Sequence, residues 1–440
     1  MAWRSQLRAA VRHPSERRVL VLRSDREWRL PRTLVRKAVW SADATTVVPA
    51  LEQRLGTRIW FLRTLAWSED KASQRIEGVC EVEPADGWDP PAHGRWVGRR
   101  ELDGLRLRDE GERRLLTDYL NALEQDDVPE ERSPWARPGW FPDVRAWLER
   151  EVSKLGRSLR RVEQVKHWSI SSVLRVETDG PDLYFKVSAR LPLWVEEASV
   201  TAMLAERFPG YVPAPLAVEP ERGWMLLPAF DDVIGWYPPL DVHEELFRRY
   251  GGMQRRSADL TSELLADGCI DRRLDTLEQR IDPLLGDADA VHRLTADEVA
   301  ELRRLAPELK EACRRLAACG VPYALVHGDL HPGNVASTVA GPVLIDWDLL
   351  CRAPVGWDHA MLLTLPRWGW PPVWYDEFAA GYGCSLRDDP VAVALAELRL
   401  VAATLMRLRA ARVDAGAMSE ARRRLAYWRG DPDAPVWRAQ

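Results

Sequence analysis

The chain has 440 residues, 46% of them hydrophobic and 29% charged, and a formal net charge of −5. Its length predicts two or three globular domains, and the small excess of acids argues against a nucleic-acid-binding protein. No stretch approaches the roughly 18 apolar residues of a membrane-spanning helix, so we expect no membrane segment. The six cysteines form no Cys-x-x-Cys pair, which is typical of a reduced, cytoplasmic protein.

Residues 1–126 are predicted to form a small α/β domain. Residues 1–12 carry several arginines and indicate an amphipathic segment without the apolar core of a signal peptide. The elements predicted after it are strands at 17–24, 58–67 and 76–82 and helices at 47–55 and 110–124. Gly56, directly after the first helix, indicates a helix C-cap.

The order of these elements, with a Leu-Pro turn before the first helix, resembles the Nudix family. The metal-binding helix of that family carries several carboxylates. The matching positions here hold Pro49, Ala50, Gln53 and Arg54. The resemblance therefore implies an inactive Nudix-like domain that serves binding, regulation or assembly, and an unrelated α/β domain is the alternative.

Residues 127–157 are expected to be a linker and a connecting helix. The linker is acidic at first and is broken by Pro134 and Pro138, a composition that does not continue a helix or a central strand. Residues 141–155 then show apolar side chains at helical spacing, and Gly156 follows.

Residues 158–230 alternate apolar strands with turns. The expected elements are strands at 161–167, 173–178 and 183–187, a helix at 194–208, and a strand from Gly223 that runs into a segment marked by Pro228. Lys186 lies inside an apolar strand, where it is either a functional lysine or the exposed lysine of an edge strand. The helix supplies two adjacent acids, Glu196 and Glu197.

Residues 240–320 are predicted to be helical, at 243–254, 258–266 and 298–318. On these helices His243 and His292 fall on polar faces, and we assign them no role. Two further amphipathic helices are expected within 390–428.

The segment 325–348 holds the strongest functional pattern. His327-Gly-Asp329-Leu-His331-Pro-Gly-Asn334 lies between two apolar runs, and the second run ends in Asp346-Trp347-Asp348. This spacing is that of a kinase catalytic loop followed by an acid on the next strand. In phosphoryl transfer one carboxylate orients the acceptor hydroxyl, while an amide oxygen and a second carboxylate hold magnesium. The alternative is that these residues only make turns and caps.

The string His-Gly-Asp-Leu-His-Pro-Gly-Asn, followed by Ile-Asp-Trp-Asp, resembles the aminoglycoside phosphotransferase and choline kinase-like family over about residues 155–430. The resemblance implies an α+β fold of two lobes, like that of protein kinases. Its β-rich N-lobe would span 158–230 and its helical C-lobe, with the catalytic loop, 231–440. The smaller α/β domain would precede both lobes.

The resemblance also implies a set of site residues. Asp329 would be catalytic, Asn334 and Asp346 would bind the metal, and Lys186 would clamp phosphates with Glu197, with Glu196 as the competing partner. The remaining implied residues are Ser169, Ser171 and Ser172 at the phosphates, Leu227 and Ala229 at the adenine edge, His331 and Asp348 on the substrate side, and the structural His327 and Asp358, the latter as a helix N-cap. The loop with the three serines departs from kinases because it contains no glycine.

The implied activity is transfer of the γ-phosphate of ATP or GTP, with Mg²⁺, to a hydroxyl of a small polar molecule such as an aminoglycoside, an amino alcohol or a sugar. Neither the acceptor nor the oligomeric state follows from the sequence. The missing loop glycine leaves a second interpretation open, a non-catalytic nucleotide sensor. A protein kinase is disfavoured, because Gly328 stands where protein kinases keep Arg and Asp-Trp-Asp replaces Asp-Phe-Gly.

Overall fold

The structure, a computed structural model, describes residues 3–125, 128, 132–190, 194–230, 239–286, 288–291, 295–320, 322–354, 357–358, 362 and 370–385. This part of the chain divides into two compact units, and the boundary in the sequence lies between Pro181 and Asp182. The boundary lies inside the segment 158–230 that the sequence suggests as one lobe. Both units contain sheets and helices, which confirms the expected α+β class.

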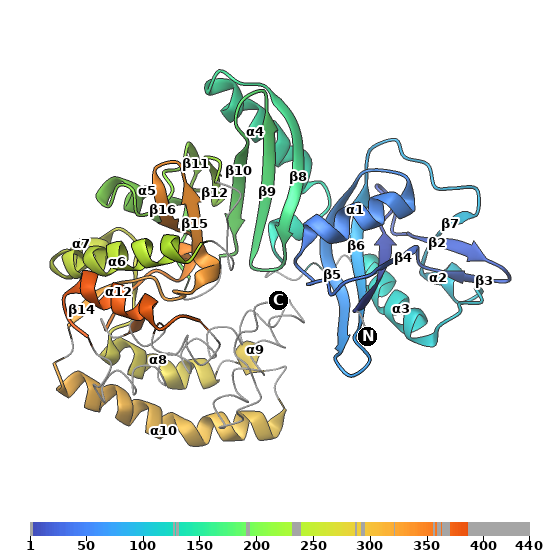
Figure 1. Ribbon diagram of the computed structural model, residues 1–440. Helices are drawn as coiled ribbons and strands as arrows, with labels where there is room; N and C mark the ends of the chain where they lie inside the picture. Colours follow the sequence, from blue (N-terminus) through green and yellow to red (C-terminus); the bar gives the residue numbers. More distant parts are fainter. Residues whose placement is uncertain are drawn as a thin grey trace. The chain divides into compact units, whose positions relative to one another are not determined.

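Two sheets and two long helices form residues 3–125 of the first unit (Figure 1). The sheets have strand orders β4-β1-β6-β5 and β3-β2-β7. β1 runs parallel to β6, and the other pairs are antiparallel. The elements are β1 (Arg4–Val11), β2 (Val19–Ser24), β3 (Glu27–Arg29), β4 (Arg32–Val35), α1 (Ala44–Leu55), β5 (Ile59–Asp70), β6 (Arg75–Pro84), β7 (Gly94–Val97), α2 (Arg99–Leu102) and α3 (Glu110–Gln125).

β1 is a central strand, although the sequence indicated only an amphipathic segment there. Its side chains alternate between two cores: Leu7 and Ala9 pack in the core of α1, and Ala10 packs in the core of α3. The two helices thus use opposite sides of the strand, as the period of two requires. Arg8, which gives the segment its polar character, is paired with Glu77 at 2.8 Å.

α1 is terminated as the sequence predicts. The Asp43 carboxylate accepts the backbone N–H of Thr46 at 3.2 Å and caps the N-terminus. Gly56 has a φ of 71°, in the left-handed region, and its N–H donates to the carbonyl of Glu52 at 2.8 Å. The C-cap predicted at Gly56 is confirmed, because this conformation favours a residue without a Cβ.

The rest of the first unit packs directly on this domain. Gln164 on β8 accepts the backbone N–H of Phe61 and donates to its carbonyl, both at 2.8 Å. Trp60 stacks on Phe141 of α4, with ring centroids 4.2 Å apart. The elements involved are η1 (Pro134–Ala136), α4 (Trp140–Lys154), β8 (Leu159–His167) and β9 (Ser171–Thr178).

The second unit begins with strands and continues mainly as helices. β10 pairs antiparallel with β12, β12 with β11, β14 with β17, and β15 with β16. The elements are β10 (Leu183–Ser188), α5 (Glu197–Arg207), β11 (Ala217–Glu219), β12 (Trp224–Leu227), α6 (Leu240–Ser257), η2 (Ala258–Leu260), α7 (Thr261–Ala266), β13 (Ile270–Asp271), α8 (Leu274–Gly286), α9 (Ala288–Val291), α10 (Ala296–Ala318), β14 (Tyr323–Val326), η3 (Pro332–Asn334), β15 (Val335–Thr338), β16 (Gly341–Leu344), η4 (Trp347–Leu349), β17 (Cys351–Pro354) and α12 (Val373–Tyr382).

The helices predicted at 194–208, 243–254 and 298–318 are confirmed as α5, α6 and α10. The two helices expected within 390–428 lie outside the described residues. Among the residues that the structure describes, none of the helices has the length and apolar character needed to span a membrane.

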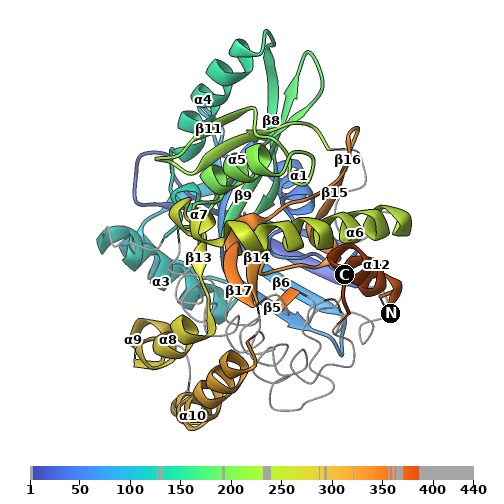
Figure 2. The ribbon, with the colours of Figure 1, turned by 90° about the vertical axis from the view of Figure 1, so that its left-hand side faces the viewer.

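α6 and α12 lie side by side in both ribbon views (Figures 1 and 2). They approach closely through two glycines. A Cβ on Gly251 would lie 2.2 Å from the carbonyl oxygen of Phe378, and a Cβ on Gly381 would lie 1.8 Å from that of Arg248. Larger residues at either position would force the helices apart.

The prediction that His243 lies on a polar face is wrong. The side chain is fully buried in α6, and its ring stacks on Trp374 of α12 with centroids 4.5 Å apart. Burial lowers the pKa of His243 to about 4, so the ring is neutral. The close crossing of α6 and α12 explains the burial, because it covers a helix face that contains polar residues. His292 lies outside the described residues.

Candidate active site

The Asp329 loop (His327–Asn334) begins where β14 ends. His327 is fully buried, and its Nε2–H donates to the carbonyl of Ile345 at 3.0 Å. Its Nδ1 accepts the backbone N–H of Asp329 at 3.3 Å. Burial lowers the pKa of His327, so the ring is neutral. Both of its ring nitrogens form hydrogen bonds with backbone groups. This side chain joins the loop to the end of β16.

A buried cluster supports the loop from α6. The Asp358 carboxylate accepts the backbone N–H of His327 at 3.0 Å and the hydroxyl of Tyr250 at 2.6 Å. Gln254 donates to the same oxygen at 3.3 Å. The sequence suggested Asp358 as a helix N-cap, but these contacts place its carboxylate under the Asp329 loop. The cap itself stays a prediction, because residues 359–361 are outside the described part.

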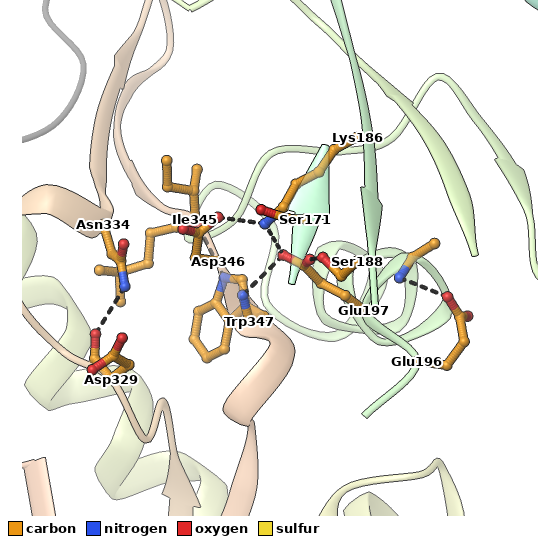
Figure 3. Close-up of polar contacts among 12 residues, drawn as sticks. Ser171, Lys186, Ser188, Glu196, Glu197, Asp329, Asn334, Ile345, Asp346 and Trp347 are labelled. Atoms are coloured by element: carbon orange, nitrogen blue, oxygen red, sulfur yellow. Dashed lines mark hydrogen bonds and ion pairs between the residues drawn. The ribbon is translucent and has the colours of Figure 1, made fainter. Parts of the chain in front are cut away.

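Within the loop, Asp329, His331 and Asn334 face one another. The Asn334 amide donates to the carbonyl of Asp329 at 2.9 Å, which identifies the nitrogen end of the amide and turns its oxygen the other way. His331 Nε2 lies 3.5 Å from the Asp329 carboxylate, while its Nδ1 accepts the N–H of Gly333 at 3.0 Å. The structure thus brings together three of the residues that the sequence singled out. Figure 3 shows two of them, Asp329 and Asn334.

Asp346 follows β16 in a left-handed conformation, with φ 62° and ψ 59°. A non-glycine residue there is strained, and such strain is frequent at functional sites. The next residue, Trp347, is fully buried, and its indole N–H donates to the carbonyl of Leu344 at 2.9 Å. The buried indole locks the turn that presents the Asp346 carboxylate.

Lys186 on β10 reaches this carboxylate (Figure 3). Its ammonium group donates to Asp346 and, at 2.6 Å, to Glu197. Burial by itself lowers the pKa of Lys186, but Asp346 and then Glu197 outweigh it, so the net shift is upward and the ammonium stays charged. The interpretation of Lys186 as an exposed edge-strand lysine is wrong, since the side chain is only 6% exposed.

The structure distinguishes the two adjacent acids of α5. Glu196 is the N-cap, and its carboxylate accepts the backbone N–H groups of Ala198 and Ser199. Glu197, in the first turn, is almost fully buried and is the partner of Lys186. Glu197 also accepts the backbone N–H of Trp347 at 3.1 Å, so one carboxylate connects the lysine to the turn of Asp346.

Asp348 lies two residues beyond Asp346. Burial, followed by the nearby charge of Glu197, raises the pKa of the Asp348 carboxyl well above its ordinary value. Its backbone carbonyl accepts the N–H of Val195 at 3.1 Å, just before α5. The suggested substrate-side role of Asp348 stays a prediction, and the structure places the residue in the acidic group around Lys186.

Leu227 and Ala229 are placed at the end of β12. Leu227 is buried, is paired in register with Tyr184 on β10, and packs with Met225. Ala229 is half-buried, and residues 231–238 that follow are outside the described part. Contact of this segment with an adenine edge stays a prediction.

The Ser loop (Trp168–Ser172) belongs to the first unit. Ser172 is fully buried next to His167. The Nε2–H of His167 donates to the carbonyl of Leu62 at 2.9 Å, which leaves Nδ1 of the neutral ring as an acceptor. The Ser172 hydroxyl donates to this Nδ1 at 3.0 Å. The Ser171 hydroxyl accepts the indole N–H of Trp168 at 2.7 Å. The suggested contact of Ser169, Ser171 and Ser172 with phosphate stays a prediction.

Sequence reasoning missed two supporting residues. Ser188 donates its hydroxyl to the second oxygen of Glu197, and Tyr250 accepts the backbone N–H of His327 at 2.9 Å. The sequence could have predicted the role of Ser188, because it lies two residues after Lys186 on one strand and such residues share a face. No sequence pattern predicts the role of Tyr250, because this residue is distant in sequence from His327 and contacts its backbone.

The donor set fits Mg²⁺. The amide oxygen of Asn334 and the carboxylate of Asp346 are hard oxygen ligands, which this ion prefers. Among the described residues, no group of three or more His, Cys, Asp or Glu side chains could hold a metal ion without other ligands. A bound Mg²⁺ would therefore take further ligands from nucleotide phosphates or water, which is its usual mode in kinases.

Comparison with solved structures gives several similar proteins. The choline kinase LicA from Streptococcus pneumoniae is 13% identical, with a TM-score of 0.46 over 65% of this chain and 99% of that one. A choline/ethanolamine kinase family protein from Mesorhizobium loti is 18% identical, with a TM-score of 0.47 over 67% and 95% of the two chains. The macrolide 2′-phosphotransferase MphH from Brachybacterium faecium is 18% identical, with a TM-score of 0.44 over 66% and 99%.

No curated protein matches the chain. None of these findings supports the Nudix-like interpretation of residues 1–126, which stays a prediction. Residues 161–401, more than half of the chain, match the model of the phosphotransferase enzyme family, APH. This match includes Lys186, Glu197, Asp329, Asn334 and Asp346. The chain therefore belongs to the phosphotransferase enzyme family.

Proposed function

We propose that this protein is a magnesium-dependent small-molecule kinase that transfers the γ-phosphate of ATP or GTP to a hydroxyl group. The observation that carries the proposal is the buried Lys186 ammonium, held jointly by Glu197 and Asp346. Desolvating three charges is costly unless each is paired, so a cluster of this kind is retained for chemistry more readily than for stability.

Lys186 would bind the nucleotide phosphates through its charge. Glu197 fixes the position of that charge, because it is buried and is itself held by Ser188 and by the backbone of Trp347. Asn334 and Asp346 would hold the cation, which when bound neutralises phosphate charge. Such preorganised charges make up most of the catalysis in phosphoryl transfer.

Asp329 would orient the acceptor hydroxyl and accept its proton. The carboxylate is at the exit of a rigid strand, and its backbone is held at both ends, by His327 and by Asn334. His331, whose Nε2 lies 3.5 Å from the same carboxylate, would contact the acceptor. This arrangement supplies positioning, which removes the entropy cost of bringing hydroxyl and phosphate together.

The acceptor class that we propose is a small polar molecule with a hydroxyl group, such as an aminoglycoside, an amino alcohol or a sugar. Among the similar structures, one is named a choline kinase and another a macrolide 2′-phosphotransferase. The test is ADP or GDP release by the purified protein, with Mg²⁺ and nucleotide, against a panel of metabolites and antibiotics. At least one acceptor should stimulate release, and its product should gain the mass of one phosphate.

The alternative function is a non-catalytic nucleotide sensor. One observation favours it: the hydroxyl of Ser171 is bonded to Trp168, and that of Ser172 to His167 at the end of β8. Tight binding of Mg²⁺ and nucleotide, without turnover for any acceptor on the panel, would establish the sensor and reject the kinase. We place either activity in the cytoplasm, where both nucleotides are available.

For residues 1–126 we propose a role in binding, regulation or assembly. Pro49, Ala50, Gln53 and Arg54 stand on α1 where a Nudix enzyme would need carboxylates. The purified protein should accordingly leave nucleoside diphosphate compounds intact in the presence of Mg²⁺. Hydrolysis that survives Asp329→Ala would overturn this proposal.

A further inference from the structure

A group of charged side chains lies where the parallel strands β1 and β6 of the first unit end. Ala10 on β1 and Val79 on β6 pack in the core of α3. Arg12 and Glu81 follow these residues by two positions, so their side chains point to the same side of the sheet. The N–H of Arg12 donates to the carbonyl of Val82 at 2.9 Å, which keeps Arg12 paired with β6 just beyond the end of β1.

Glu81 is the centre of this group and is only 1% exposed. One carboxylate oxygen accepts the hydroxyl of Tyr119 on α3 at 2.8 Å. The other accepts the Nε–H of Arg63 on β5 at 2.5 Å, and Nη1 of Arg12 lies 3.8 Å from the first oxygen. A buried carboxylate needs a paired cation and hydrogen bonds, and Arg63 and Tyr119 already supply both. The charge of Glu81 therefore requires no further arginine.

The linker brings two more arginines to the same place. It is attached to the sheet, because the N–H of Gly139 donates to the carboxylate of Glu83 on β6 at 3.3 Å and η1 packs against β5. Arg132 precedes η1 and is half-buried, whereas Arg137 follows η1 and is exposed. The guanidinium of Arg137 donates to the carbonyl of Arg132 at 3.2 Å, which holds the two residues together.

The guanidinium of Arg132 makes neither a hydrogen bond nor an ion pair with the described residues. Burial, followed by the charge of Arg63, lowers the pKa of Arg132 from its ordinary value. The charges of Arg137 and Arg12 act in the same direction, and Glu81 opposes them. Arg132 is thus a partly covered cation among other cations, an arrangement that costs free energy when nothing neutralises it.

The cations of this place outnumber the anions. We call Arg12, Arg63, Arg132 and Arg137 the arginine group; its neighbouring carboxylates are Glu81 and Glu83. Four positive charges against two negative ones leave a formal excess of two positive charges. Water alone can solvate the exposed Arg137, but the side chain of Arg12 is only 25% exposed and Arg132 is half-buried. An anion is the missing counter-charge that this excess calls for.

We propose that the arginine group binds the phosphate group of a small anion, either free phosphate or a phosphate ester. Such a group carries close to two negative charges at neutral pH, and its oxygens accept several guanidinium N–H groups at once. The proposal rests on the binding role proposed for residues 1–126 and names its ligand class. It uses none of the residues assigned to phosphoryl transfer, so it is independent of the kinase proposal.

The test is calorimetric titration of the full chain with inorganic phosphate and with glycerol phosphate, without Mg²⁺ and at constant ionic strength in sodium chloride. Arg132→Gln and Arg12→Gln each remove one guanidinium and keep the pair of Arg63 with Glu81. Each should weaken binding by about tenfold or more, the effect of one hydrogen bond to a charged group. Binding of both probes identifies the phosphate group itself as the ligand; binding of glycerol phosphate alone identifies an ester. Either result supports the proposal.

Arg114→Gln is the control with the same change of charge. Arg114 is exposed on α3, so its substitution should leave the affinity for both probes as in the wild type. Thermal unfolding gives a second measurement. Without phosphate Arg132→Gln should melt at or above the wild-type temperature, because it relieves repulsion. Phosphate should raise the melting temperature of the wild type and of Arg114→Gln, but hardly that of Arg132→Gln.

The remaining outcomes would overturn the proposal. These are no saturable binding of either probe, wild-type affinity in Arg132→Gln, or equal weakening in Arg114→Gln, which would indicate an unspecific effect of charge. Loss of the binding in Lys186→Met would also overturn it, because the phosphate would then bind at the lysine of the second unit. None of these results affects the kinase proposal, which depends on turnover. Hydrolysis of nucleoside diphosphate compounds, in contrast, would reject the binding role without deciding whether the arginines bind phosphate.

Discussion

The Asp329 loop and the Ser loop are both polar turns at the ends of strands, but different parts of the chain hold them. The Asp329 loop is supported by Tyr250 and Asp358, which lie inside the family match and inside the same unit. The Ser loop is supported by Ser133 and Trp135, linker residues that donate to two of its carbonyls and precede residue 161, where the match begins.

The difference has a physical basis. The Asp329 loop presents carboxylate and amide side chains, which need a rigid backbone, and the buried histidine and aspartate provide it from within the fold. The Ser loop lacks glycine, so its backbone has to be oriented from outside. We therefore expect substitutions in the first loop to abolish turnover.

The largest effect is expected from the carboxylates of the second unit. Asp329→Ala and Asp346→Ala should each lower turnover by about 1000-fold or more, since they remove the proposed proton acceptor and a proposed metal ligand. The rate of ADP or GDP release at saturating acceptor measures the loss. Asp282→Ala, a change at an exposed aspartate, is the control and should leave the rate unchanged. If the rate of Asp329→Ala stayed within about tenfold of the wild-type rate, Asp329 would not be the proton acceptor.

The next effect is on the backbone of the Asp329 loop. Gly328 has a φ of 84°, and a Cβ there would lie 2.5 Å from the carbonyl oxygen of Leu349. Gly328→Ala should therefore lower the free energy of unfolding by about 3 kcal/mol, from strain and the clash together. Urea denaturation measures it.

Gly268→Ala is the matched control for this loop. Gly268 also has a positive φ, of 100°, but no atom of the described residues lies within 4 Å of the position that a Cβ would take there. Gly268→Ala should lower the free energy of unfolding by only about 1 kcal/mol, because it adds backbone strain but no clash. Equal losses in the two variants would mean that the close approach to Leu349 is not what requires a glycine.

The Ser loop predicts a pH effect. Burial lowers the pKa of His167 to about 4, below its ordinary value near 6.5. Between these values the unfolded chain binds a proton that the folded histidine does not, so stability falls as the pH decreases. The contribution should be about 2 kcal/mol between pH 7 and pH 5.

Urea denaturation across this pH range tests the assignment. His167→Gln should flatten the dependence, because glutamine does not titrate, whereas substitution of the exposed His93 by Gln should leave it as in the wild type. An unchanged slope in His167→Gln would show that the ring is not held neutral by burial.

The smallest effect concerns Ser188. Ser188→Ala removes the hydroxyl from the second oxygen of Glu197 and leaves the pair with Lys186 in place. The KM for the nucleotide should rise about tenfold, the low end of the effect expected for one hydrogen bond to a charged group, with little change in turnover. A Ser188→Thr variant keeps the hydroxyl and should restore the wild-type KM. A change in turnover alone would contradict this role.

Local sequence patterns predicted the parts of the site whose function depends on residue type and spacing. Asp329, Asn334 and Asp346 were proposed in this way, and Lys186 was singled out as a charge within an apolar strand. The choice between Glu196 and Glu197 required the structure. One residue of offset decides whether a carboxylate caps α5 or faces β10, and helix starts are not predicted to that accuracy.

What the sequence could not show depends on contacts between distant segments. His243 was assigned to a polar face because its helix neighbours are polar, and only the crossing with α12 buries it. β1 was not recognised as a strand, because its arginines obscured the alternation of Leu7 and Ala9. Ser133 and Trp135 carry no motif, since they act on backbone carbonyls about 35 residues further along the chain.

The most direct test of the central claim is acceptor-stimulated release of ADP or GDP by the wild-type protein and by Asp329→Asn, followed by mass spectrometry of the acceptor. The account predicts stimulated release by the wild type, an acceptor heavier by one phosphate, and neither signal in the variant, although the variant still binds the nucleotide. Stimulated release of equal size from Asp329→Asn, or tight nucleotide binding by the wild type without release for any acceptor, would contradict it.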